Sequence, residues 1–535
     1  MSKRFRLTKA SKILIVILIV ALIGGGVLAG LKTGFIKTKT AASSDAKENV
    51  VAANKDTSSD SGTPSSENST KKTDGDATIN LSLDEWTGWK SIIDGNQGLT
   101  TQPGSIYDKL GIKVNINIIN DATQSSNALI KGDLNAAGYT INRTAFLSQK
   151  FTDAGKEVVM PFITNYSNGG DGIIAKSSIQ SVNDLVGAKI GVPEFSEAQT
   201  LVVWFVNNSD LSDEQKSEII NNLVLFSTAD DTAKAFFAGQ VDVAATWEPY
   251  LTQAQNMTDA HVLFSTASST NLVMDGILFD KEFAEAHPDV VEKFIQGALE
   301  ASSMYDTEFD AVREVMPMFN TASDEDIIAS TKTAKLTTWK DNSDLLNGTA
   351  KTIYSDMCNV WTSIGESVNA SLVDAIFDDT YIDAIADNFN TTEVSNTETV
   401  KVTEENKQTI EDTQALLSGS ASVTFEKNTA KFSDSASASE ELDKFINIAK
   451  VLDGAIIEIA GNTDPNPNSD PLDEYNKKLS LQRAEAVKNY FIMNGISVDR
   501  IVVVGNGSSN PVVDNDTEEH RAMNRRTDVS FKIIE

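Results

Sequence analysis

Residues 230–249 read DDTAKAFFAGQVDVAATWEP and place a helical pattern, Asp230 to Phe237, before a short apolar strand that ends ahead of Trp247. The same alternation of short apolar runs with amphipathic helical patterns extends over about residues 78–390. Strands that alternate with helices in this way are typical of an α/β fold with parallel strands. The sequence therefore predicts a large α/β region in the middle of the chain.

Individual elements can be placed elsewhere in this region. Ile79 to Leu83 and Val114 to Ile118 alternate with period two, which predicts strands, and Lys189 to Val192 is a candidate buried strand. Pro288 to Tyr305 carries apolar residues at helical spacing on one face. We expect a helix there.

Length and composition narrow the class of protein. At 535 residues the chain is too long for one hydrophobic core, so two or more domains are expected. Its formal charge of −31 repels phosphate backbones and argues against nucleic acid as a partner. One cysteine, Cys358, excludes an internal disulfide, and only three histidines, His261, His287 and His520, are present. No metal, cofactor or catalytic triad is expected.

The N-terminus predicts a transmembrane helix. Ile13 to Leu31 is an uncharged run of 19 residues. As a helix it would rise roughly 28 Å, close to a bilayer core of about 30 Å. The basic tail, residues 1–12, carries more positive charge than the residues that follow the run, so the tail is placed in the cytoplasm and the bulk outside. Cleavage as a signal peptide near Val27-Leu28-Ala29 is the alternative to a single-pass protein of the cell membrane.

Two polar stretches separate the predicted parts. Residues 32–77 and 391–420 contain few large apolar side chains and predict linkers, the first of them disordered, with a short helix around Asn406 to Leu417 in the second. The folded regions are then residues 78–390 and 421–535.

Three segments of the middle region resemble the nitrate, sulfonate and taurine (SsuA/TauA-like) class of ABC-transporter substrate-binding proteins. Their order and spacing carry the resemblance; they are Ser178 to Pro193, Phe236 to Pro249, and Phe283 with His287 to Val291. The resemblance implies a two-lobed type 2 periplasmic-binding-protein fold that closes over a small solute. Lobe 1 would take about residues 78–172 and 268–390, and lobe 2 about 173–267.

The predicted solute site lies where strands end. Ser196 to Thr200 open a helix directly after Gly191-Val192-Pro193, and a helix N-terminus suits an anionic group, although Ser196 as a simple cap is the alternative. Tryptophans near strand ends could stack on an organic ligand or attract a cation. Core packing is the alternative for each and is favoured for Trp204 and Trp361. The residues predicted for the cleft are Trp86, Trp89, Ser196, Glu197, Gln199, Thr200, Trp247 and Glu248.

Acidic residues leave the solute open. Six of them lie near predicted strand ends: Asp84, Glu85, Asp171, Glu197, Glu248 and Asp275. Solvated carboxylates there would have no consequence, whereas two or more facing the cleft would favour an amine-bearing or zwitterionic ligand over nitrate. The sequence predicts a small organic solute, anionic or zwitterionic.

The C-terminal region carries a denser set of motifs. Val423 and Phe425 open an alternating strand, and Gly461-Asn462-Thr463-Asp464 ends another. Residues 475–487 read YNKKLSLQRAEAV and residues 521–526 read RAMNRR. Together these motifs resemble the OmpA-like (OmpA/MotB) family of peptidoglycan-binding domains over the whole segment. The resemblance implies an α+β domain with βαβαββ order.

In that family the matching aspartate and arginine hold the diaminopimelate of the peptidoglycan stem peptide. Those roles fall on Asp464, for the ammonium, and Arg483, for the carboxylate, with Thr463 and Asn476 as supporting contacts. These residue types suit a zwitterion, because a carboxylate can bind its ammonium and a guanidinium can donate two parallel hydrogen bonds to its carboxylate. A structural ion pair is the alternative.

Two departures from the family pattern bear on this site. The usual histidine is Asn462 here, and the stretch from Asp464 to Asn476 looks longer than the family norm. Of Arg525 and Arg526, one is expected to be structural.

The combined prediction is a membrane-tethered, extracytoplasmic solute-binding protein for an ABC permease, anchored to peptidoglycan by its C-terminal domain. The alternative is a structural or signalling cell-wall protein whose solute-binding domain senses a ligand without transport. Some relatives of the two-lobed fold are enzymes, but few histidines and no nucleophile motif argue against catalysis.

Overall fold

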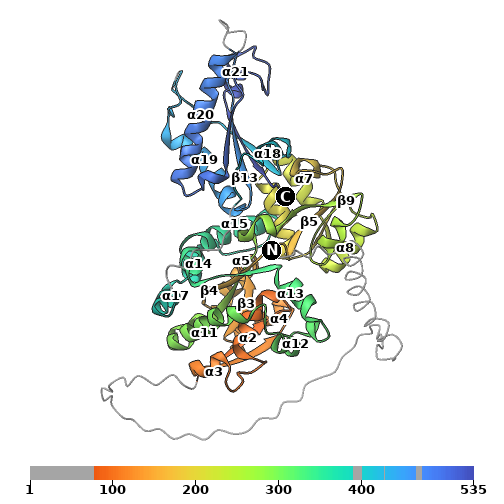
Figure 1. Cartoon of the computed structure of the whole chain (residues 1–535), viewed down its shortest axis with the longest axis vertical. Helices are drawn as coiled ribbons and strands as arrows, with labels where there is room; N and C mark the ends of the chain where they lie inside the picture. Colours follow the sequence, from red (N-terminus) through yellow and green to blue (C-terminus); the bar gives the residue numbers. More distant parts are fainter. Residues whose placement is uncertain (1–76, 390–399, 427, 466–472, 535) are drawn as a thin grey trace, which may run out of the picture. The chain divides into compact units, whose positions relative to one another are not determined.

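The computed structural model describes residues 77–389, 400–426, 428–465 and 473–534, in which three β-sheets are covered by helices (Figure 1). The predicted basic tail, the predicted transmembrane helix and nearly all of the first linker lie outside these residues. Among the helices that the structure describes, none is both long and apolar enough to cross a membrane.

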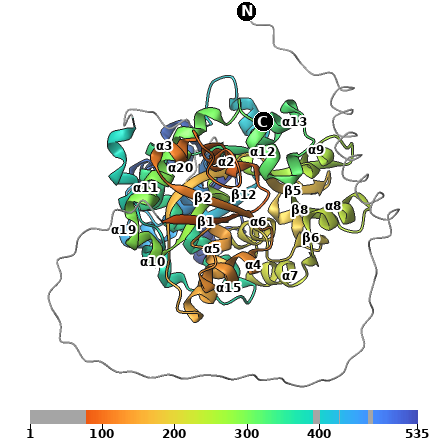
Figure 2. The same cartoon turned by 90° about the horizontal axis from the view of Figure 1, so that it is seen from below.

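The first sheet has six strands in the order β11-β4-β10-β3-β1-β2. They are β1 (Thr78–Leu83), β2 (Lys113–Ile118), β3 (Ala136–Thr140), β4 (Val158–Ser167), β10 (Met274–Asp280) and β11 (Ala334–Leu336). β1 runs parallel to β2 and to β3, and Figure 2 shows β1 and β2 side by side. β10 runs antiparallel to β3 and β4.

The second sheet has five strands in the order β7-β6-β8-β5-β9. They are β5 (Asp171–Lys176), β6 (Ile190–Pro193), β7 (Val224–Phe226), β8 (Val243–Trp247) and β9 (Ala260–Ser265). The chain enters this sheet from β4 into β5 and returns from β9 into β10. Two crossings between two sheets give the predicted two-lobed α/β architecture.

The predicted parallel sheets are in fact mixed. β6 runs parallel to β7 and β8, but β5 runs antiparallel to both β8 and β9. β5 is the first strand after the crossing from the first sheet, and β9 is the last strand before the chain returns. The predicted strands at Ile79, Val114 and Lys189 are otherwise confirmed as β1, β2 and β6.

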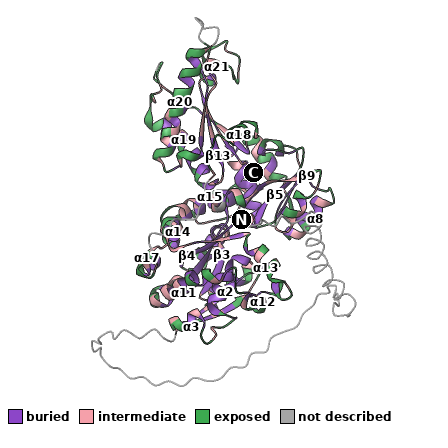
Figure 3. Ribbon diagram, in the orientation of Figure 1, coloured by how far each residue is buried: buried purple, intermediate pink, exposed green. Residues whose placement is uncertain are grey.

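Helices cover both sheets, and the strands are buried where the helices keep exposed faces (Figure 3). The helix predicted at Asp230 is confirmed, and the one predicted at Pro288 ends as an α-helix at Ala301, before Tyr305. The α-helices are α2 (Lys90–Asn96), α3 (Ile106–Leu110), α4 (Ala122–Lys131), α5 (Ile141–Asp153), α6 (Glu197–Asn207), α7 (Asp213–Asn221), α8 (Ala229–Phe237), α9 (Tyr250–Gln255), α10 (Lys281–Ala286), α11 (Pro288–Ala301), α12 (Asp310–Val315), α13 (Asp324–Thr331), α14 (Trp339–Asp344), α15 (Ala350–Ser363), α16 (Val373–Ile376) and α17 (Thr380–Ala384).

Helix α15 joins the two lobes by packing against both α5 and α6. Trp361 on α15 is 1% exposed, and its indole N–H donates to the Asn142 carbonyl at 3.0 Å. Trp204 on α6 is equally buried. Both tryptophans are therefore core residues, as predicted.

The third sheet, order β12-β15-β13-β14, organises the C-terminal region. Its elements are α18 (Lys407–Asp412), β12 (Leu417–Ala421), α19 (Ser435–Val451), β13 (Ile456–Gly461), α20 (Glu474–Met493), β14 (Ile501–Gly505), α21 (Glu518–Asn524) and β15 (Thr527–Lys532). Two details of the prediction were wrong. The first strand ends before Val423 and Phe425 and begins inside the stretch predicted as a linker. A helix, α21, also separates the last two strands.

Glycines let α20 lie directly on this third sheet. Gly461 and Gly505 are register partners on β13 and β14. A Cβ on Gly461 would meet the Ser480 carbonyl oxygen at 2.1 Å, and a Cβ on Gly505 would meet the Lys477 carbonyl oxygen at 2.6 Å. Neither contact is sterically possible, so only glycine permits this close approach of helix and sheet.

We expect Gly461→Ala to destabilise the C-terminal domain by about 1–3 kcal/mol, because the added methyl group forces α20 away from the sheet. Thermal unfolding followed by circular dichroism checks this. Gly348→Ala is the control, since nothing lies within 4 Å of its added Cβ. Equal melting temperatures for the two variants would contradict the close packing.

Candidate functional site

Carboxylates of the first lobe gather at one edge of the first sheet. Asp84 directly follows β1, and Asp275 at the start of β10 is in register with Thr140 at the end of β3. Because β10 runs antiparallel to β3, its start lies at the edge where β1 and β3 end. Asp275 is 3% exposed. Asp84 is exposed to solvent, although desolvation by the surrounding protein raises its pKa.

The second lobe contributes a matching set. Asp171, the first residue of β5, is in register with Trp247, the last residue of β8. Glu197 begins α6 shortly after β6 ends, and β6 runs parallel to β8, so Glu197 lies at the same edge of the second sheet. Asp171 is 8% exposed, whereas Trp247 is 39% exposed.

A charged contact joins the two lobes at these edges. The Arg143 guanidinium on α5 forms an ion pair with Glu197 at 3.1 Å, and the Thr140 hydroxyl donates to the other carboxylate oxygen at 2.8 Å. Thr140 is the N-cap of α5 and accepts the Arg143 backbone N–H at 2.8 Å. The first turn of α5 thus holds both oxygens of Glu197.

The four carboxylates act as one electrostatic group. Burial, followed by the charges of Asp84, Asp171 and Glu197, raises the pKa of Asp275 well above its usual value. Burial also raises the pKa of Asp171 to about 7, with Glu197 adding to the shift. Burial opposes ionisation of Glu197 as well, but Arg143 and local hydrogen bonds outweigh it and lower the pKa of Glu197.

The predicted helix-start residues satisfy one another. Ser196 caps α6 by accepting the Gln199 backbone N–H at 3.2 Å, and the Gln199 side chain accepts the Phe195 N–H at 2.7 Å. Thr200 is 1% exposed and donates to the Glu197 carbonyl at 2.6 Å. These contacts match the capping alternative for Ser196. Two side chains of this group reach the other lobe: Glu197 contacts Arg143 and Thr140, and the Thr200 hydroxyl accepts a hydrogen bond from the Asn142 amide at 2.8 Å.

The tryptophans occupy different environments. Trp89 is 1% exposed and lies in the core, where its indole N–H donates to Asp84 at 2.6 Å. Trp86 is half-buried and donates to Asn165 at 3.0 Å. Trp247 alone is largely exposed. Glu248, just before α9, accepts the Thr252 N–H and hydroxyl of its first turn at 3.1 and 2.7 Å.

Sequence reasoning missed Arg143, Asn165 and Asn142. All three belong to elements whose role depends on which strands become neighbours: Asn165 is in register with Asp275 across β4 and β10. Asn142 and Arg143 could have been found from their position directly after the strand β3, because Ser196 and Glu197 were selected for the same position after β6.

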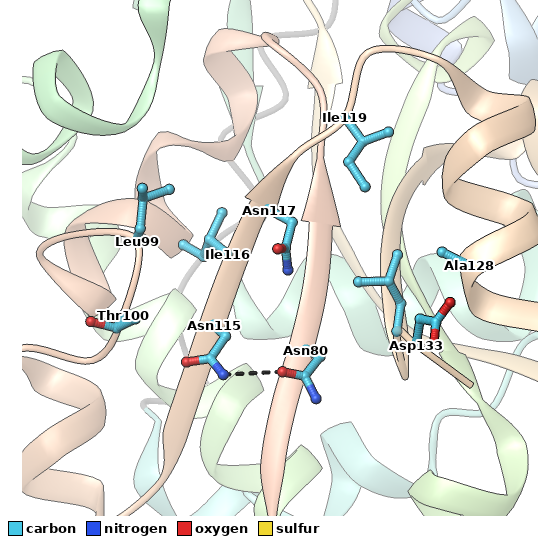
Figure 4. Close-up of a pocket in the computed structure, with 10 residues that line it drawn as sticks. Asn80, Leu99, Thr100, Asn115, Ile116, Asn117, Ile119, Ala128 and Asp133 are labelled. Atoms are coloured by element: carbon cyan, nitrogen blue, oxygen red, sulfur yellow. Dashed lines mark hydrogen bonds between the residues drawn. The ribbon is translucent and has the colours of Figure 1, made fainter. Parts of the chain in front are cut away.

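A separate hollow of about 490 Å³ lies along β2 (Figure 4). Asn80, Asn115 and Asn117 line it, and the Asn115 side-chain amide donates to Asn80 at 3.0 Å. No predicted cleft residue lines this hollow, and Asp133 is the only charged side chain that lines it. We assign it no function.

In the C-terminal region the predicted pair lies beside a third charge. Asp464 forms an ion pair with Arg525 at 3.1 Å, and Arg525 also bonds Glu518 at 2.7 Å. Arg483 is 8% exposed, donates to the Thr429 carbonyl at 3.2 Å and stacks its guanidinium over the Phe425 ring at 4.9 Å. Burial and then the charge of Arg525 lower the pKa of Arg483, against the opposing charge of Asp464.

The supporting residues lie around this group. The Thr463 hydroxyl is buried and has no hydrogen-bond partner in the part of the chain that the structure describes. Asn476 donates to Asp473 at 2.7 Å and to the Asp464 carbonyl at 3.4 Å. Asn462, in place of the family histidine, donates to Asp528 at 2.9 Å. Most of the proline-containing loop, residues 466–472, lies outside the described residues.

Arg526 differs from Arg525. It is 8% exposed, pairs with Asp528 at 2.9 Å and donates to the Asn510 carbonyl at 3.1 Å. Arg526 is therefore the structural arginine, and Arg525 is the one beside Asp464.

Two α/β lobes that meet over a charged contact, followed by a separate α/β domain with a buried arginine, define a two-part binding protein. Comparison with known families agrees. Residues 105–305 match the NMT1/THI5 like family and residues 424–525 match the OmpA family. The chain therefore joins an NMT1/THI5-like region to a C-terminal OmpA domain.

Individual relatives are similar over parts of the chain. Outer membrane porin F of Pseudomonas fluorescens is 47% identical over 76 residues, 14% of this chain and 22% of that protein. The peptidoglycan-binding protein ArfA of Mycobacterium bovis is 39% identical over 90 residues, 17% of this chain and 26% of that protein. The chain thus matches only about a quarter of the length of these curated relatives. The periplasmic aliphatic sulphonate binding protein SsuA of Escherichia coli is 14% identical, with a TM-score of 0.44, 57% of this chain and 98% of that one being covered.

The raised pKa of Asp171 predicts a pH-dependent stability. In the folded protein Asp171 keeps its proton up to about pH 7, whereas an unfolded aspartate loses it near pH 4, so stability falls as the pH rises between these values. Asp171→Asn is expected to remove the contribution of Asp171 to this fall in the free energy of unfolding, which is up to about 4 kcal/mol. Chemical denaturation at pH 5 and pH 8 measures it.

The exposed Asp133 provides the control, because Asp133→Asn should keep the wild-type pH dependence. An unchanged decline in Asp171→Asn would show that Asp171 ionises normally.

Proposed function

We propose that this protein is an extracytoplasmic solute-binding protein of the ABC-import type that is anchored to peptidoglycan by its OmpA domain. The observation that carries the solute-binding half is the joining of Arg143 in one lobe to Glu197 in the other, at the edge where Asp84, Asp171 and Asp275 also lie. A site assembled from both lobes is completed only when they close. A ligand that bridges them stabilises the closed state by its differential affinity.

The match to the NMT1/THI5-like family supports this reading of the middle region. The permease partner and the membrane tether at residues 13–31 belong to the proposal. Binding, rather than catalysis, is the expected activity of both domains.

Peptidoglycan anchoring rests on the group around Asp464 and Arg483. A stem-peptide zwitterion would place its ammonium on Asp464, beside or in place of Arg525, and its carboxylate on Arg483. Thr463 and Asn476 are proposed as supporting contacts, and the unpartnered Thr463 hydroxyl gives such a ligand one further polar group. The similarity to the peptidoglycan-binding protein ArfA is consistent with this proposal.

Glu197→Ala is expected to weaken solute binding about tenfold or more, because the closed state loses its inter-lobe ion pair while the open state loses little. A thermal-shift screen of the full-length protein against small sulfonates, nitrate, amino acids and amines identifies a ligand for the measurement. Lys176→Ala is the control, since its ion pair with Asp242 lies within one lobe. If no compound of the panel raises the melting temperature, the proposed solute binding is contradicted; tight binding of a ligand that no permease takes up would favour the signalling alternative.

Asp464→Ala and Arg483→Ala are each expected to reduce cosedimentation with insoluble peptidoglycan by tenfold or more, because each removes one of the two charges that hold the zwitterion. The full-length protein in mild detergent is sedimented with purified peptidoglycan. Glu485→Ala, on the exposed face of α20, should bind like wild type. Wild-type binding in both variants would rule out this pocket, and no binding by folded wild type would remove the anchor altogether.

A further inference from the structure

The charges of the inter-lobe site do not balance. Its four carboxylates are Asp84, Asp171, Glu197 and Asp275, and Arg143 is the one cation whose charge acts on Asp84 and Glu197. Arg143 is already paired with Glu197. Within the described residues, Asp84, Asp171 and Asp275 have no ion-pair partner, so the site carries an excess of negative charge.

Asp275 shows this most clearly. Its side chain is 3% exposed, and the single N–H of the neighbouring Trp86 indole donates to Asn165 at 3.0 Å. A carboxylate buried to this extent without a cation or a full set of donors is costly. The unliganded protein relieves that cost by holding protons, as the raised pKa values of Asp275 and Asp171 indicate.

An independent acceptor lies at the same junction. Asn142, next to Arg143, is completely buried, and its Oδ1 has no hydrogen-bond donor among the residues that the structure describes. Its amide nitrogen donates to Thr200 on α6 at 2.8 Å, which places this side chain between the two lobes. A buried acceptor is normally paired with a donor from the protein, from ordered water or from a ligand, so Asn142 leaves one acceptor open at this junction.

An anionic solute does not fit these groups. The start of α6 faces its own Glu197 carboxylate, and the Gln199 N–H is taken by Ser196. A metal ion does not fit them either, because no three acidic, histidine or cysteine side chains of the described residues are placed to hold one. The negative charge is spread along the site rather than focused on a point.

Aromatic side chains adjoin the carboxylates. Trp247 is 39% exposed and directly opposite Asp171 in the antiparallel pair, so both side chains point to the same face of the sheet. Trp86 is half-buried beside Asp275. Tryptophan faces attract ammonium groups and pack against methylene chains.

We propose that the solute is an organic cation with at least two protonated nitrogens separated by methylene groups, a linear di- or polyamine. This inference rests on the proposed solute-binding function. The ammonium groups replace the protons on Asp275 and Asp171 and supply the missing hydrogen-bond donors. The methylene segments lie against Trp247 and Trp86.

The test is isothermal titration of the full-length protein in mild detergent with spermidine and putrescine, and separately with ethanesulfonate, nitrate and CaCl₂. The amines are expected to bind, with affinity rising from pH 6 to pH 8 because the carboxylates lose their protons. Titration at pH 6.5 in buffers of different ionisation enthalpy should show protons released on binding. Besides one another, these carboxylates face three other titratable or charged groups, Arg143, Tyr139 and Tyr305, which bear on the pH dependence of binding.

Asp275→Asn and Asp171→Asn are each expected to weaken amine binding tenfold or more and to reduce the proton release. Neither should lower the melting temperature of the unliganded protein at pH 8, since each removes a repelled charge, and this keeps loss of binding distinct from misfolding. Asp133→Asn, in the hollow along β2, is the matched control.

The outcomes separate the two proposals. Binding of ethanesulfonate or nitrate without amine binding would overturn the amine assignment and leave solute binding intact, and tight binding of Ca²⁺ alone would do the same. Amine binding that survives both substitutions would overturn the assigned site. If neither the amines, the anions nor any compound of the thermal-shift panel binds, the solute-binding function itself fails.

Discussion

The contact of Arg143 with Glu197 is the constraint on which the arrangement of the middle region depends. Each residue stands in the first turn of a helix that leaves the end of a strand, one in each lobe. The contact therefore joins the two sheets at the edges where β1, β3, β6 and β8 end. The carboxylate side chains at these two edges are brought together as a result. Helix α15 packs against α5 and α6 behind this contact and supports it with buried apolar side chains.

Bringing the edges together has an electrostatic consequence. One guanidinium is matched to one carboxylate, and three further carboxylates are left to repel one another, of which Asp171 and Asp275 are buried. Such a group is stable only if it is protonated or if a cation joins it. The same feature that makes the unliganded site costly is the basis for proposing a positively charged solute, because a neutral or anionic solute offers no relief.

The C-terminal domain also holds a group of partly buried charges, but with a different balance of signs. Its two glycines, Gly461 and Gly505, let α20 lie close enough to the sheet for Arg483 to be buried against Phe425 near the end of β13. There Asp464, Arg483 and Arg525 form a nearly balanced set of charges. A set that contains both signs suits a zwitterion, whereas the inter-lobe site, with its excess of carboxylates, does not.

The sequence alone predicted the two-part organisation, the positions of several strands and helices, and the residues of the C-terminal motif. These follow from local periodicity and from motif spacing, which are properties of the chain itself. It also selected Glu197 and named Asp84, Asp171 and Asp275 as residues near strand ends. Only the tertiary structure decided that β10 runs antiparallel beside β3, that Trp89 is core while Trp247 is exposed, and that Arg143 meets Glu197. Strand order and burial depend on contacts between residues far apart in the chain, and no local pattern encodes which distant carboxylates will share one desolvated site.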